Sequence, residues 1–203
     1  MYTAKKFTFG NLVGISAKQI EVHIKLYEGY VKFTNTLEEV LADLMSAQGG
    51  SASGGKDSEK NAYALGEVKR RLGFEFNGMR MHEHYFEQWT GPSTALGTDS
   101  ALGSALSAQY GSMDKWMAEF KAVSMMRGIG WAMLSYDPVG KHFLNHFVMD
   151  HELGQLNSTV TVLALDMWEH AYMVDYTPAE KSKYVEAFFK NLNGDLVAKR
   201  FKV

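Results

Sequence analysis

The chain has 203 residues, a length that fits one domain or two small ones. Hydrophobic residues make up 46% of it and charged residues 22%, which argues against a disordered or a membrane-embedded protein. The formal net charge of −2 gives no general attraction for nucleic acid or anionic lipid, and the lack of cysteine excludes disulfides, thiolate metal sites and cysteine nucleophiles. Any metal must therefore be bound by His, Asp or Glu.

The first part of the chain predicts a helical hairpin. Apolar residues recur at steps of three and four over residues 20–44, and Ser16 is a suitable N-cap for this helix. The Gly/Ser stretch at 49–55 predicts an exposed, flexible connector. A second helix is expected over about 59–89, with an interruption near Gly73.

The small and polar segment at 91–103 predicts a linker between two regions. Its start, Gly91-Pro92-Ser93, cannot continue the preceding helix because proline restricts the residue before it. We therefore expect an N-terminal helical hairpin domain at 1–91 and a C-terminal α/β domain at 92–203.

The second region combines helices with strands. Ser112 is expected to cap a helix that runs through Met126, and Thr177-Pro178 to start the last helix. Asp137-Pro138-Val139-Gly140 predicts a hairpin turn. Three runs rich in β-type residues lie at 131–136, 142–149 and 159–165. The expected fold class is therefore α+β, with an N-terminal antiparallel helical hairpin followed by a three-stranded antiparallel sheet flanked by helices.

A carboxylate and an imidazole stand four residues apart directly after the third run, in Asp166-Met167-Trp168-Glu169-His170-Ala171-Tyr172. Where a strand turns into a helix, this spacing can aim Asp166 and His170 at one point, and the pair of ligand types suits iron or manganese. A bare Asp-x-x-x-His is more often a helix cap beside a structural histidine. The longer motif Asp-x-Trp-Glu-His-Ala-Tyr, however, closely resembles the signature of the iron/manganese superoxide dismutases.

This resemblance implies a metal centre and a dimer. It implies that Asp166 and His170 are metal ligands, and that Glu169 contacts the ligand histidine of a partner subunit. The stretch at 15–23 resembles the opening helix of the family, which implies His23 as the first ligand. Whether two or four subunits assemble stays open.

Two tyrosines follow the first expected ligand. His23, Tyr27 and Tyr30 face the same way within roughly 40° around an α-helix. Tyr30 with the valine after it resembles the gateway tyrosine through which substrate enters in the family, although the step from His23 is seven residues and usually eight. Tyr27 stands in the intermediate place, where a histidine is usual. A core aromatic stripe is the other explanation, and this departure affects substrate access and proton delivery.

Two histidines compete for the role of second ligand. His82 and His84 lie about 200° apart on a helix, so only one of them can face the ion. Counting from Phe76-Asn77 favours His84, whereas the match of the family pattern to His82 with Tyr85-Phe86 favours His82. We expect His82 to be the ligand and His84 to be a surface or interface histidine.

His151 resembles the family residue that bonds to the metal-bound water and the gateway tyrosine, where many members have glutamine and some archaeal members histidine. The resemblance implies that Tyr30 and His151 adjust the redox potential without binding metal. The alternative is that His151 is a loop histidine without a role. His142 and His146 match no motif and are expected to be ordinary strand residues.

The implied activity is that of a superoxide dismutase, which converts superoxide to oxygen and hydrogen peroxide by cycling one iron or manganese ion per subunit between 2+ and 3+. Gly78 favours manganese, and His151 favours iron or a protein that is active with either metal, while Ala164 fits neither pattern, so the choice of metal stays open. We expect an antioxidant enzyme of the cytoplasm, with no nucleic-acid or membrane partner. The alternatives are a non-catalytic protein that retains the fold and a mononuclear iron oxygenase.

Overall fold

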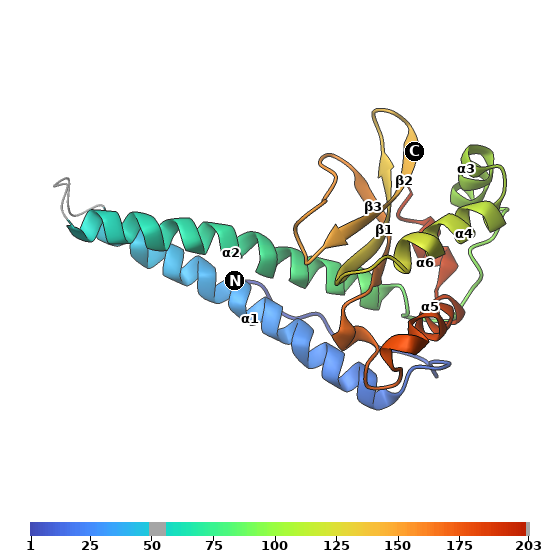
Figure 1. Ribbon diagram of the computed structural model, residues 1–203, viewed down its shortest axis with the longest axis horizontal. Helices are drawn as coiled ribbons and strands as arrows, with labels where there is room; N and C mark the ends of the chain where they lie inside the picture. The colour runs from blue at the N-terminus through green and yellow to red at the C-terminus, as the bar shows by residue number, and fades with distance from the viewer. Residues whose placement is uncertain (49–55, 202–203) are drawn as a thin grey trace.

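The computed structural model describes residues 1–48 and 56–201, so the expected connector at 49–55 lies outside the described residues (Figure 1). The elements in chain order are α1 (Ala17–Gln48), α2 (Lys56–Glu87), α3 (Ala101–Tyr110), α4 (Met113–Ser124), β1 (Gly130–Asp137), β2 (His142–Met149), β3 (Val160–Asp166), the 3₁₀-helices η1 (Glu169–Ala171) and η2 (Pro178–Glu180), α5 (Lys181–Lys190) and α6 (Gly194–Ala198). The fold is α+β, as the sequence predicts.

Helices α1 and α2 pack side by side as an antiparallel hairpin that extends away from the remainder of the protein (Figure 1). Ser16 caps α1, because its Oγ accepts a hydrogen bond from the backbone N–H of Gln19 at 3.0 Å. The interruption expected near Gly73 is wrong, since α2 is one helix from Lys56 to Glu87. A single glycine costs a helix only about 1 kcal/mol relative to alanine, which packing along a 32-residue partner outweighs.

The linker expected at 91–103 is shorter than predicted, because α3 begins at Ala101. The Oγ of Ser100 accepts a hydrogen bond from the N–H of Gly103 at 2.9 Å and so caps this helix. Leu102 and Leu106 are fully buried. Tertiary burial therefore makes a helix of a segment whose small and polar residues alone resemble a loop.

The three predicted β runs form one antiparallel sheet in the order β2-β1-β3. In the β1–β2 hairpin, Gly130 pairs with Met149 at one end and Asp137 with His142 at the other. The predicted turn at 137–140 is confirmed, with the N–H of Val139 donating to Oδ1 of Asp137 at 2.9 Å. Helix α4 packs on β1 and β2, and α2 packs against β3.

Both edge strands of this sheet are bonded by glutamine side chains. The Gln88 amide donates to the carbonyl of Ala164 at 2.7 Å and accepts from its N–H at 2.8 Å. The Gln109 amide likewise donates to the carbonyl of Phe143 in β2 at 2.7 Å and accepts from its N–H at 2.8 Å. These amides satisfy backbone groups that an edge strand would otherwise expose.

The C-terminal helices complete the core. Thr177 begins η2 with a capping box to Glu180, as the predicted helix start requires, and α5 follows from Lys181 to Lys190. The short α6 at 194–198 was not predicted, and α4 ends at Ser124, two residues before the expected end. Among the helices of the described residues, none is long and apolar enough to span a bilayer.

Candidate metal centre

Four side chains from four separate elements meet in the interior. His23 comes from α1, His82 from α2, Asp166 from the last position of β3, and His170 from η1. One nitrogen of each imidazole and one carboxylate oxygen all lie within 4.8 Å of one another. The motif after β3 therefore does bring Asp166 and His170 together, although on a 3₁₀-helix and not on an α-helix.

The three imidazoles all direct Nε2 at one oxygen. Oδ2 of Asp166 lies 3.0 Å from Nε2 of His23, 3.1 Å from that of His170 and 3.4 Å from that of His82. Nε2 of His82 is buried without a hydrogen-bond partner among the described residues. A buried polar atom without a partner is costly unless a ligand takes it, so the donor set fits a bound cation.

Neighbouring backbone groups fix the orientation of two of these side chains. Nδ1 of His82 lies 2.6 Å from the carbonyl of Gly78 and must donate to it, so the lone pair is on Nε2 and faces Asp166. The backbone N–H of Trp168 donates to Oδ1 of Asp166 at 2.9 Å and leaves Oδ2 to the imidazoles. Both groups are thereby prepared for metal coordination.

Burial sets the charge states of the centre. Burial lowers the pKa of the His23 and His82 imidazoles, which are therefore neutral at neutral pH. Burial alone would raise the pKa of Asp166, but His170 and His23 outweigh it and hold the pKa of that carboxyl well below its usual range. Neutral imidazoles with one carboxylate are a ligand set that suits iron and manganese.

A hydrogen-bonded chain of aromatic residues lies beside the four-residue cluster. Nε1 of Trp131 donates to Nδ1 of His151 at 2.9 Å, so His151 carries its proton on Nε2 and donates it to the Tyr30 hydroxyl at 2.7 Å. Burial lowers the pKa of His151 to about 4, which keeps the imidazole neutral. Burial also raises the pKa of the Tyr30 hydroxyl, which stays protonated.

Two tryptophans shield the imidazoles. The Trp131 ring meets His82 edge-on with ring centres 5.0 Å apart, and Trp168 stacks on His170 at 5.5 Å. Trp131 is fully buried. These rings give the cluster an apolar wall that lowers the local dielectric constant and excludes water.

The remaining histidines and Tyr27 lie outside the cluster. His84 is partly buried beside Arg200, and burial followed by that guanidinium lowers its pKa to about 4. His142 and His146 lie on β2, where His146 Nε2 is 3.0 Å from the Ser135 hydroxyl. Tyr27 is fully buried, and its hydroxyl accepts from the N–H of Lys5 and donates to Glu83, which ties it to the N-terminal segment and not to Tyr30.

Gln19 is a further residue of this region that no sequence pattern indicates. This residue is 1% exposed, and its amide bonds to the backbone of His170 and of Val174. Both partners lie more than 150 positions away along the chain, so no local pattern could have indicated them.

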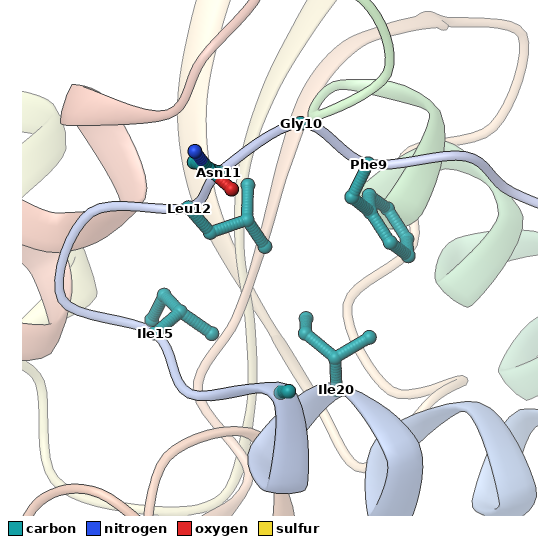
Figure 2. A pocket seen from close by; sticks show the side chains of 7 residues that line it. Phe9, Gly10, Asn11, Leu12, Ile15 and Ile20 are labelled. Carbon is teal, nitrogen blue, oxygen red and sulfur yellow. The ribbon is translucent and has the colours of Figure 1, made fainter.

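A separate hollow of about 460 Å³ lies between the loop at 9–15 and the first turns of α1. Figure 2 shows the apolar side chains of Phe9, Leu12, Ile15 and Ile20 around this space. Its lining contains none of the four clustered residues, so the hollow is not part of the centre.

Residues 98–200 match the family model of the C-terminal domain of iron/manganese superoxide dismutases. An iron superoxide dismutase of Aquifex pyrophilus is 34% identical, over 95% of this chain and 86% of its own length. An iron superoxide dismutase of Cupriavidus metallidurans is 35% identical, over 94% and 90%. A manganese superoxide dismutase of Halobacterium salinarum is 33% identical, over 88% and 82%. Relatives named for either metal are thus similar to this chain to nearly the same degree.

Proposed function

The chain belongs to the iron/manganese superoxide dismutase family, and we propose that its dismutase activity resides in the centre formed by His23, His82, Asp166 and His170. The convergence of three imidazole Nε2 atoms on one oxygen of Asp166 carries this assignment. A bound iron or manganese ion supplies one-electron redox chemistry there by cycling between 2+ and 3+.

The protein contributes a fixed and largely dry ligand set. The Gly78 carbonyl directs the lone pair of His82 toward Asp166, where an ion would be held, and the N–H of Trp168 holds the carboxylate of Asp166 in place. Because burial keeps His23 and His82 neutral, their nitrogens are free to bind the ion without releasing protons at neutral pH.

We assign Tyr30 and His151 to proton handling and redox tuning. Reduction of superoxide to hydrogen peroxide consumes one electron and two protons. The Tyr30 oxygen receives a hydrogen bond from His151, so its own O–H stays free to donate to an anion. Its raised pKa means that it acts as a hydrogen-bond donor and does not ionise.

The experiment that tests this assignment reloads the metal-free protein with iron and with manganese in parallel and measures superoxide disproportionation and bound metal. The variants His82→Ala and His84→Ala form a matched pair two positions apart on α2. We expect His82→Ala to lose both metal and activity, and His84→Ala to keep both. Loss of metal from His84→Ala with retention in His82→Ala would overturn the choice of ligand. Tight binding without turnover in the wild type would favour a non-catalytic protein or an oxygenase.

We further propose a homodimer with Glu169 and His170 near its interface. Glu169 is exposed, and the His170 side chain is 18% exposed whereas the other three members of the cluster are almost completely buried. The apolar side chains of Met173 and Val174, which follow η1, are each 48% exposed. A second copy that covers this surface would complete the shielding of His170. In our proposal the protein is an antioxidant enzyme of the cytoplasm.

A further inference from the structure

Gln19 joins the start of α1 to the segment that carries His170. Its Nε2 donates to the backbone carbonyl of His170 at 2.7 Å, and its Oε1 accepts from the N–H of Val174 at 3.0 Å. The Gln19 side chain is 1% exposed, so water has little access to its amide. One amide therefore holds both ends of a five-residue backbone stretch.

Gln19 lies one helical turn before His23 on the same face of α1. The same rigid helix thus presents a proposed metal ligand at one position and, four residues earlier, the amide that bonds the backbone of another proposed ligand. The distance between His23 and His170 in the centre is therefore linked to the length and orientation of the Gln19 side chain.

The segment that Gln19 holds is short, and its backbone hydrogen bonds are mostly within residues 168–176. His170 belongs to a 3₁₀-helix of three residues, a form with poorer hydrogen-bond geometry than an α-helix. Two other bonds join this region to the residues just before α1, from the N–H of Ser16 to Asp175 at 2.6 Å and from the Tyr176 hydroxyl to the carbonyl of Gly14. Both of these are exposed, whereas the Gln19 amide is buried beside the centre.

We propose that Gln19 is a positioning residue that sets the place of the His170 imidazole relative to His23. This inference rests on the proposed function, because it takes His170 to be a metal ligand. A ligand held by a short helix can shift by a few tenths of an ångström when a buried bond to its backbone is removed, and outer partners of metal ligands typically affect metal affinity or activity by about 10- to 100-fold.

The test compares Gln19→Met with Gln109→Met, in the metal-loaded protein. Gln109 makes the same two kinds of bond to a backbone, at Phe143 on the outer strand β2, away from the centre. We expect both variants to melt at a lower temperature than the wild type. Only Gln19→Met should shift the visible absorption of the bound, oxidised metal and release the metal to a chelator, with a rate about 10-fold or more above the wild type.

A second variant isolates the contact with His170 and keeps the test decisive if Gln19→Met does not fold. Gln19→Glu retains an acceptor for the N–H of Val174 and loses the donor to the His170 carbonyl, so it should also shift the absorption. Wild-type absorption and metal release in both position-19 variants would overturn the positioning role and leave only a structural one. A wild-type protein that binds neither metal would instead overturn the proposed function, and this inference with it.

Discussion

The contact between Tyr30 and His151 depends on a third residue, Trp131. Because the indole can only donate, it forces His151 to accept at Nδ1 and to donate at Nε2. The donor–acceptor direction of this series of hydrogen bonds is thus fixed by one buried N–H, that of Trp131 on β1. Replacement of Trp131 would release the imidazole to adopt the other tautomer.

Removal of the Tyr30 hydroxyl tests its role without disturbing the ring. Tyr30→Phe keeps the aromatic packing against His82 and His151 but loses the O–H. We expect activity per bound metal to fall by about 10- to 100-fold, with metal content unchanged, as stopped-flow superoxide decay and metal analysis would show. Tyr63→Phe is the control, because Tyr63 is 87% exposed on the same hairpin. Equal activity in the two variants would remove Tyr30 from the mechanism.

The sequence could predict the residues of the centre whose neighbours are local. The spacing of Asp166 and His170 lies within one motif. Helix geometry allows only one of His82 and His84 to face the ion, and the match of His82 with Tyr85-Phe86 to the family pattern favours His82, which lies in the cluster. It could not predict Gln19 or the bond from Trp131 to His151, since their partners are set only when distant elements pack. Tyr27 shares a helix face with His23, yet its hydroxyl serves the N-terminal segment.

At the level of elements, α2 meets α1 through a glycine. A Cβ at Gly78 would lie 2.6 Å from the Tyr30 ring, closer than real Cβ contacts. A Cβ at Gly66, in the same helix, would meet nothing within 4 Å. One glycine of α2 is therefore required by close packing and the other is not.

These two glycines make a matched pair of variants. Gly78→Ala should displace the Tyr30 ring, which the new methyl group would overlap, and so lower the free energy of unfolding by about 1–3 kcal/mol and reduce activity. Gly66→Ala should raise the free energy of unfolding by about 0.5–1 kcal/mol, since alanine is the better helix former. Urea unfolding of both variants measures the difference, and a stabilised Gly78→Ala would contradict this packing argument.

The capping box at the start of η2 predicts a dependence of stability on pH. Hydrogen bonds from Lys183 and then from Thr177 lower the pKa of Glu180 to about 2, from an ordinary value of 4.5. The stability that this carboxylate contributes is therefore fully present above about pH 4.5 and is lost as the pH falls through about 2. In the metal-free protein, the melting temperature of Glu180→Gln should lie below that of the wild type at pH 6 and approach it at pH 3. A constant difference across this range would argue against the carboxylate.

Strand and helix positions were predicted with unequal success for a physical reason. The β runs and their turn carry local signals, in aromatic and β-branched residues and in an Asp-Pro turn, and the observed strands differ from them by at most one residue at each end. Helices α3 and α6 lack such signals and form because their few apolar side chains are buried. The division into domains at 91 and 92 stays a prediction.

At the scale of the whole molecule, the proposed dimer makes a direct prediction. Met173→Lys would place a charge in the proposed interface and should convert a dimer to a monomer in sedimentation experiments at micromolar concentration. Val139→Lys is the control, because Val139 is 86% exposed at the tip of the β1–β2 turn. A wild type that sediments as a monomer, or a Met173→Lys variant that remains dimeric, would contradict the proposed interface.

The four clustered residues come from distant parts of the sequence, so an ion bound to them would link these parts together. His23 and Asp166 are 143 positions apart, and an ion bound to both would act as a covalent-like cross-link in a protein that has no cysteine. A disulfide that closes a loop of about this length restricts the unfolded chain by roughly 4–5 kcal/mol. Unlike a disulfide, this cross-link is made and lost with the supply of the ion. The fraction of folded protein would then rise and fall with the concentration of available metal, so the amount of folded protein would indicate how much metal its surroundings supply.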